Sequence, residues 1–93
     1  MGDKSGQAGP AKKWKKGDAV RVLNTASSIE WYNALIRTSE KTAPVCIPQL
    51  RRKLAVLKGI RLMSVFTVVD AIGDQVCIST KHTRIALFVS EVD

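Results

Sequence analysis

A change in composition at Gly17 sets the strongest limit on what this chain of 93 residues can fold into. The segment before it consists mostly of small, polar and basic residues, and Trp14 is its only large apolar residue after Met1. Such a segment buries too little apolar surface to offset the conformational entropy that ordering would cost. We therefore expect a basic disordered tail over residues 1–17 and one small domain over residues 18–93, with room for a single core.

The chain is strongly basic, with 15 Lys and Arg against 8 Asp and Glu and a formal net charge of +7. A short chain of this kind most often meets a polyanion, either nucleic acid or an anionic membrane surface. Its most apolar segment, residues 62–69, is far shorter than the roughly 20 residues of a membrane span, and its N-terminus lacks the apolar stretch of a secretory signal. We expect a soluble intracellular protein with no membrane partner.

Residues that could carry chemistry are few. Cys46, Cys77 and His82 are the only cysteines and histidine, which is too small a set for a four-ligand structural zinc site. Because each cysteine lies in an apolar run, free buried thiols in a reducing compartment are favoured over a disulfide. The chain has no carboxylate pair assignable to acid–base work and no Gly-rich phosphate loop. We expect no enzyme activity, cofactor, metal or small-molecule substrate.

Capping and turn residues predict two helices in the first half of the domain. Ser27 and Glu30 fit a capping box at the start of a helix over residues 27–38. Its buried stripe would consist of Ile29, Tyr32, Leu35 and Ile36. A second helix is predicted over residues 48–56, with Pro48 in its first turn and Gly59 at positive φ after its end. The side facing the core would carry Leu50, Leu54 and Leu57. Residues 18–24 fit either a short strand or a connecting segment.

The second half of the domain predicts a third helix and a hairpin. The helix would span residues 60–72, because its apolar residues recur with a helical period that we weigh above their β-branched content. These residues are Leu62, Val65, Phe66, Val69 and Ile72. Gly73 and Asp74 would end it, and residues 76–80 and 85–89 would form an antiparallel pair. The predicted fold is α+β, a winged helix-turn-helix with three helices, a C-terminal β-hairpin and a basic N-terminal tail.

Basic residues concentrate in three places along the chain. In the tail, Trp14 stands among lysines, where an indole can stack on a base. Between Lys41 and Val69 there are six basic residues and no acidic one, which favours polyanion contact over an ordinary solvated face. The hairpin turn adds a basic tip. The candidate RNA-binding residues are Lys12, Lys13, Trp14, Lys15, Lys16, Arg51, Arg52, Lys53, Lys58, Arg61, Lys81, His82 and Arg84.

The junction of tail and domain contains Lys12-Lys13-Trp14, Lys16-Gly17 and Leu23-Asn24, and it is followed by Pro48, Leu54, Gly59 and Lys81-His82. In this order the residues resemble the eukaryotic small-subunit ribosomal protein twenty-five family. The resemblance implies a structural constituent of the small ribosomal subunit in the cytoplasm, with a winged-helix fold, on the subunit head near the exit tRNA site. The implied partners are small-subunit rRNA, neighbouring small-subunit ribosomal proteins and, through the tail, tRNA.

Two other functions stay open. A winged-helix DNA-binding regulator would place the third helix in a major groove, although residues 62–72 contain no Arg, Lys, Asn or Gln to read base edges. The second alternative is a winged-helix module for protein contacts, whose tail would only increase solubility. We rank rRNA binding through phosphate contacts and shape above both.

Overall fold

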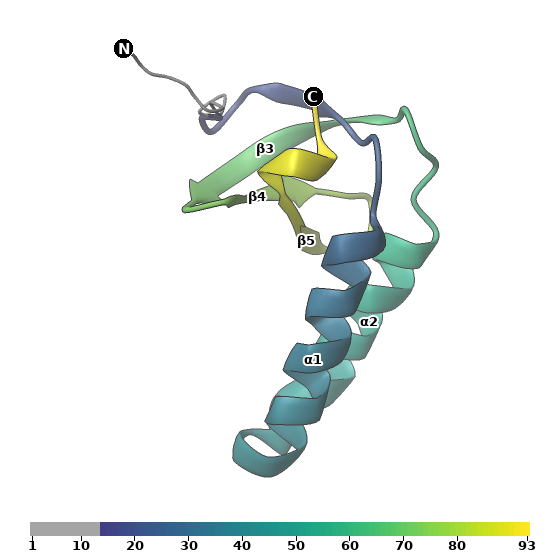
Figure 1. Cartoon of the computed structure of the whole chain (residues 1–93), viewed down its shortest axis with the longest axis vertical. Coiled ribbons are helices and arrows are strands. Elements are labelled where there is room, and N and C mark those ends of the chain that lie inside the picture. Colours follow the sequence, from purple (N-terminus) through teal and green to yellow (C-terminus); the bar gives the residue numbers. More distant parts are fainter. Residues whose placement is uncertain (1–13) are drawn as a thin grey trace.

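The computed structural model describes residues 14–93, which form a pair of helices beside an antiparallel sheet (Figure 1). The first strand precedes both helices, and the other three strands follow them. In chain order the elements are β2 (Ala19–Arg21), α1 (Ala26–Thr42), η1 (Pro44–Cys46), α2 (Ile47–Lys58), β3 (Val65–Ile72), β4 (Gln75–Ser79), β5 (Arg84–Phe88) and η2 (Val89–Glu91). The segment over residues 18–24, left open by its sequence, therefore contains a strand.

The sheet has the order β2-β3-β4-β5 and all neighbours are antiparallel. After β5 the chain turns through η2 and returns to β2, where Arg21 and Asp93 exchange backbone hydrogen bonds of 2.8 and 2.9 Å. A bridge between Val22 and Val92 continues this pairing. Because β2 is paired on both sides, the sheet curls back toward its own beginning.

The predicted third helix is wrong, and with it the winged helix-turn-helix. Residues 60–64 form a loop, and the rest of that segment is β3, which hydrogen-bonds to β2 on one side and β4 on the other. Its burial alternates: Phe66 and Val68 face inward while Val65 and Thr67 are exposed. β-Branched residues favour a strand, and β2 and β4 supply the backbone hydrogen bonds that stabilise it. These partners could not be inferred from the spacing of apolar residues within the segment.

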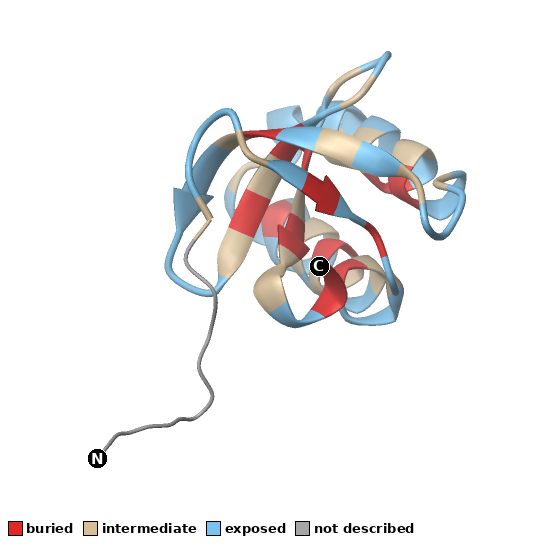
Figure 2. Cartoon of the chain, turned by 90° about the horizontal axis from the view of Figure 1, so that it is seen from above, coloured by how far each residue is buried: buried red, intermediate tan, exposed pale blue. Residues whose placement is uncertain are grey.

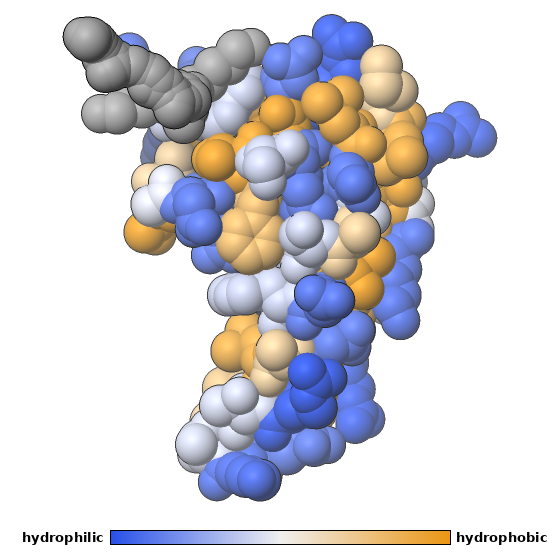
Figure 3. Space-filling model, in the orientation of Figure 1, coloured by the Kyte–Doolittle hydropathy of each residue, from blue (hydrophilic) through white to orange (hydrophobic). Residues whose placement is uncertain are grey.

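Three of the apolar residues whose spacing predicted the third helix are more than half exposed. Their exposed fractions are 54% for Leu62, 63% for Val65 and 69% for Ile72. Figure 3 shows hydrophobic residues at the surface of the sheet end of the molecule, whereas hydrophilic residues dominate the lower part of the helix pair. The fold that the ribosomal resemblance implied is therefore not the fold of this chain, which has two helices and a four-stranded sheet.

The antiparallel pair predicted near the C-terminus is present as β4 and β5, with Ile78 opposite Ile85. It is not the wing of a helix-turn-helix, because the segment predicted as the helix before it is the strand β3, which pairs with β4. The residues expected to end a helix instead make the turn between β3 and β4, where Gly73 has a φ of 60°. A glycine suits this left-handed conformation because a Cβ atom would be strained there.

The second helix is present but longer than predicted, as α2, with Pro48 in its first turn and Leu54 and Leu57 buried. The first helix, α1, buries Tyr32 and packs Ile29 and Ile36 against the core. Gly59 ends α2 at a φ of −90°, so the expected positive φ is wrong.

Figure 2 shows the buried residues in the centre, where strands and helices face one another. The most buried apolar residues are Leu57, Ile78, Ile85, Leu87, Val20, Val22, Val68 and Val76.

The predicted capping box of α1 is also wrong. The residue at the N-cap is Thr25, which makes no side-chain cap, and Ser27 lies inside the helix. The buried carboxylate of Glu91 takes this role: its Oε2 accepts hydrogen bonds from the backbone N–H groups of Ser27 at 3.0 Å and Ser28 at 3.3 Å. Its Oε1 accepts from the Ser28 hydroxyl and, at 3.3 Å, from the backbone N–H of Phe88. A carboxylate here satisfies otherwise unpaired N–H groups and faces the positive end of the helix dipole.

The outer edge of β5 is closed by side chains of the two helices. The backbone N–H of Ala86 donates to the Tyr32 hydroxyl at 2.9 Å, and that of Phe88 donates to Ser28 Oγ at 3.3 Å. Lys53 Nζ donates to the backbone oxygen of Arg84 at 2.6 Å. These contacts leave β5 a poor template for a further strand and fasten the sheet to the helix pair. Among residues 14–93, neither α1 nor α2 has the combination of length and hydropathy that a membrane-spanning helix needs.

Candidate nucleic-acid interface

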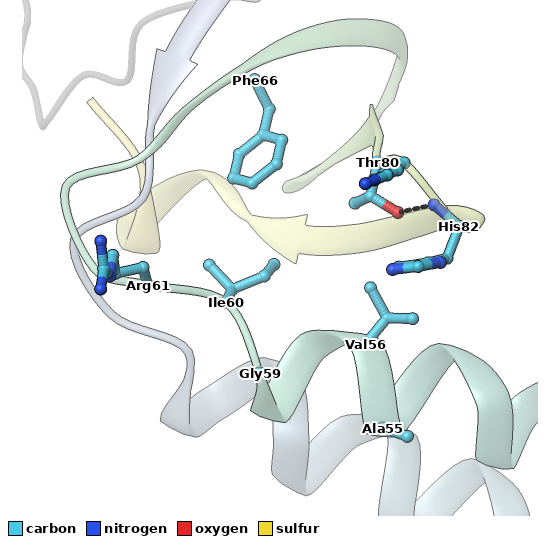
Figure 4. A pocket seen from close by; sticks show the side chains of 9 residues that line it. Ala55, Val56, Gly59, Ile60, Arg61, Phe66, Thr80 and His82 are labelled. Carbon is cyan, nitrogen blue, oxygen red and sulfur yellow. Dashed lines mark hydrogen bonds between the residues drawn. The ribbon is translucent and has the colours of Figure 1, made fainter.

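A groove of about 470 Å³ lies between the C-terminal half of α2 and the sheet (Figure 4). Four parts of the chain build it: α2, the loop after α2, β3 and the turn between β4 and β5. The lining residues are Ala55, Val56, Gly59, Ile60, Arg61, Phe66, Thr80, Lys81 and His82. None of these nine is acidic. The groove therefore brings together three of the predicted RNA-binding residues from segments far apart in sequence.

The floor of the groove is apolar. Figure 4 shows the Phe66 ring extending from β3 toward Ile60, with Val56 of α2 across from them. All three side chains are half-buried and pack on the core with their inner sides. Sequence reasoning missed them as site residues because it assigned Phe66 and the residues around it to a helix core. The signal that could have placed Phe66 on a strand was the β-branched content of residues 65–69, because β-branched side chains favour strands.

The ends of the groove are basic. Arg61 stands on the loop at one end, and His82 stands on the β4–β5 turn at the other (Figure 4). Both residues and Lys81 are exposed, and none of the three forms an ion pair within residues 14–93. The positive charges of Arg61 and Lys81 are therefore available to an anionic partner, and no carboxylate in the lining neutralises them. His82 adds a ring N–H that can donate a hydrogen bond.

A network of backbone and threonine contacts fixes the turn that carries Lys81 and His82. The backbone N–H of Thr80 donates to the backbone oxygen of Thr83 at 2.9 Å. Thr80 Oγ1 in turn accepts from the N–H groups of Thr83 at 3.0 Å and His82 at 3.2 Å. Threonine hydroxyls commonly stabilise tight turns in this way. The backbone of the tip is thus fixed, and the exposed side chains of Lys81 and His82 extend from it.

The loop that carries Arg61 is anchored to Val22, which directly follows β2. The backbone N–H of Met63 donates to the Val22 oxygen at 2.7 Å, and the N–H of Val22 donates to the Ser64 oxygen at 2.9 Å. Met63 has a φ of 73°, a left-handed conformation that costs about 1–2 kcal/mol in a residue other than glycine. The pairing with Val22 sustains this strained residue, so the position of Arg61 is set by the chain at the end of β2.

A basic band continues from the groove along α2. Arg52 is exposed and lies one turn before Val56, on the side of the helix that faces the β4–β5 turn, where it lines a smaller hollow with Thr83. Arg51 and Lys58 are exposed on the adjacent side of α2. These three side chains extend the positive surface beyond the groove without entering it.

Two further candidates lie apart from the groove. Lys53 is half-buried, and its Nζ donates to the Arg84 backbone oxygen and, at 3.5 Å, to Thr83 Oγ1. Its observed contacts therefore join α2 to β5. Arg84 is exposed beside a hollow of about 160 Å³ that Tyr32, Asp70 and Cys77 also line.

The tail candidates are only partly described. Lys12 and Lys13 lie outside the described residues, and Lys15 and Lys16 are exposed. Trp14 is half-buried against the core. The backbone N–H of Gly17 donates to the Val68 oxygen at 2.7 Å. Residues 14–17 therefore join the folded part of the chain, and the stacking of Trp14 on a base stays a prediction.

The two cysteines lie in different environments. Both are free, but Cys46 is exposed, so its predicted burial is wrong, and Cys77 is half-buried. Burial raises the pKa of Cys77, Asp70 raises it further, and Lys53 and Arg84 oppose this. A raised pKa reduces the thiolate fraction at neutral pH and hence reactivity. Within residues 14–93 no three His, Cys, Asp or Glu side chains gather as a metal site would require.

Comparison with known proteins gives no relative for this chain: no family model, no curated protein and no solved structure matches it. Its function is therefore argued from the groove and the charges around it.

Proposed function

We propose that the protein binds RNA and that phosphates are held at the basic ends of the groove. The observation that supports this is the placement of Arg61, Lys81 and His82 around one groove whose lining includes no acidic residue. Phosphate contacts by Lys and Arg release counterions from the nucleic acid, and this release drives much of the affinity. The basic band formed by Arg51, Arg52 and Lys58 would add further contacts along the backbone.

A DNA-binding regulator is less well supported. Phosphates are common to both nucleic acids, but a regulator also needs an element that reads base pairs in a groove. The helix predicted for that role is the strand β3, which is paired on both sides within the sheet.

We propose more specifically that the RNA is small-subunit rRNA, with neighbouring ribosomal proteins as further partners and tRNA in reach of the basic tail. This part of the proposal depends on the sequence resemblance alone. Because the chain does not adopt the winged helix that the resemblance implied, it needs its own test, separate from the test of RNA binding.

The first test measures binding of the purified full chain to a fluorescently labelled RNA by anisotropy. We expect the logarithm of the association constant to fall with the logarithm of salt concentration at a slope of about −2 or steeper, as for about three or more phosphate contacts to a single strand. The association constant would then drop at least about 15-fold between about 50 and 200 mM salt. No binding at the lower salt concentration would refute the proposal.

The second test is sedimentation of lysate from the source cell under conditions that keep ribosomes intact. The protein is expected in the ribosomal fractions and, after the subunits are separated by removing magnesium, with the small subunit. Protein that stays at the top of the gradient would reject the ribosomal part of the proposal and leave RNA binding to be judged by the first test.

A further inference from the structure

The groove has an apolar floor that phosphate binding alone does not require. Phosphates need cations and N–H donors, and these stand at the two ends, at Arg61 and at Lys81 with His82. Between them lie Phe66, Ile60 and Val56, whose outer surfaces remain open to the groove. A ligand that covers the whole groove therefore has an apolar middle flanked by negative charge.

We propose that the groove binds one unpaired base of single-stranded RNA, with the base against Phe66 and its flanking phosphates at the two basic ends. The inference builds on the proposed function and names the form of RNA that the site takes. A nucleobase has two apolar faces and is joined on either side to a phosphate, so its charge pattern complements that of the groove. Stacking on an aromatic ring tolerates any base, because every base presents such a face.

The geometry of the floor is prepared for this ligand. The Phe66 side chain is half-buried and packs on the core on one side, so little further side-chain ordering is needed on binding. The turn at Thr80 and the anchored loop at Arg61 hold the two ends at a fixed separation. The volume of about 470 Å³ lies within the range of pockets that enclose small organic ligands.

Double-stranded RNA would use the site differently. In a duplex the bases are stacked on one another, and an A-form helix presents mainly phosphates and 2′-hydroxyls to a protein. Such a partner can reach Arg61 and Lys81 but leaves the floor uncovered. The floor therefore distinguishes single strands from duplexes, whereas the basic ends bind both.

The test compares two labelled probes, a single-stranded RNA without secondary structure and the same strand annealed to its complement. Full-length protein should bind the single strand more tightly. Phe66→Leu, which keeps an apolar side chain but removes the ring, should weaken single-strand binding about tenfold and leave duplex binding unchanged. The matched control is Phe88→Leu, which alters the other half-buried phenylalanine, outside the groove; this variant should bind both probes like the unmodified protein.

A measurement on the unmodified protein covers the case in which Phe66→Leu does not fold. A single strand carrying one 2-aminopurine should change its fluorescence on binding as its base leaves its neighbours and stacks in the groove. Equal affinity for both probes, with no fluorescence change, would overturn the inference while leaving RNA binding in place. Displacement of RNA by an acidic peptide whose own binding depends on Phe66 would also overturn it. If neither probe binds, the proposed function of RNA binding is itself refuted.

Discussion

Replacing Glu91 by alanine is expected to lower the free energy of unfolding by about 3 kcal/mol or more, the largest stability effect that we predict for a polar side chain here. The carboxylate is only 3% exposed and accepts hydrogen bonds from Ser27, Ser28 and Phe88. Removing it leaves buried donors without an acceptor, and hydrogen bonds to a charged group are worth about 1.5–3 kcal/mol each. It also removes a negative charge from the N-terminus of α1.

Urea unfolding followed by circular dichroism measures this loss directly. In a domain of this size a loss of about 3 kcal/mol corresponds to a fall of about 12–24 °C in the melting temperature. The control is Glu30→Ala, which removes the exposed carboxylate that the predicted capping box places opposite Ser27. It should stay within about 0.5 kcal/mol of the unmodified protein. A Glu30 variant as unstable as the Glu91 variant would show that the cap is assigned to the wrong residue.

The cap shows where prediction from this sequence fails and why. The pair Ser27 and Glu30 has the right spacing for a capping box, but the acceptor for the N–H groups of Ser27 and Ser28 is Glu91, at the other end of the chain. Only the return of the C-terminal residues to β2 brings Glu91 to the helix. No local pattern contains that information, because it depends on how the sheet closes.

Elements whose character is decided locally were predictable. The proline and the leucine spacing of α2 predicted a helix, and the structure buries Leu54 and Leu57 as expected. The β4–β5 pair was predictable for the same reason, since a short turn joins two β-prone runs. In β3 the spacing of the apolar residues fits a helix, whereas their β-branched side chains fit a strand. The segment is a strand because β2 and β4 hydrogen-bond to it on either side.

The candidate site was predictable in its charges but not in its shape. Arg61, Lys81 and His82 stood out as basic residues in turns, yet nothing local indicates that they share a groove. The sheet order brings them together, because β3 begins just after Arg61 and β4 ends just before Lys81. The apolar floor was not predicted, because Phe66 was assigned to a helix and counted as a core residue. In the structure Phe66 packs on the core with one side and lines the groove with the other.

Reversing the charge of both ends of the groove, with Arg61→Glu and Lys81→Glu together, is expected to weaken RNA binding by about a hundredfold or more. The change removes two phosphate contacts and sets two carboxylates against the polyanion, and like charges placed together at an interface cost several kcal/mol, on the order of 3 or more. Both side chains are exposed, so the fold should be retained. Anisotropy with the single-stranded probe measures the loss, which should shrink as salt screens the repulsion.

The matched control reverses Arg37 and Lys41 to glutamate, which changes the net charge by the same amount. Both side chains are exposed near the C-terminal end of α1, at the far end of the helix pair from the groove (Figure 1). If the groove is the binding site, this variant should lose less than about fivefold, because distant charges are largely screened at physiological salt. Equal losses of affinity in the two variants would mean that RNA binding depends on the overall charge of the protein. The groove would then not be the binding site.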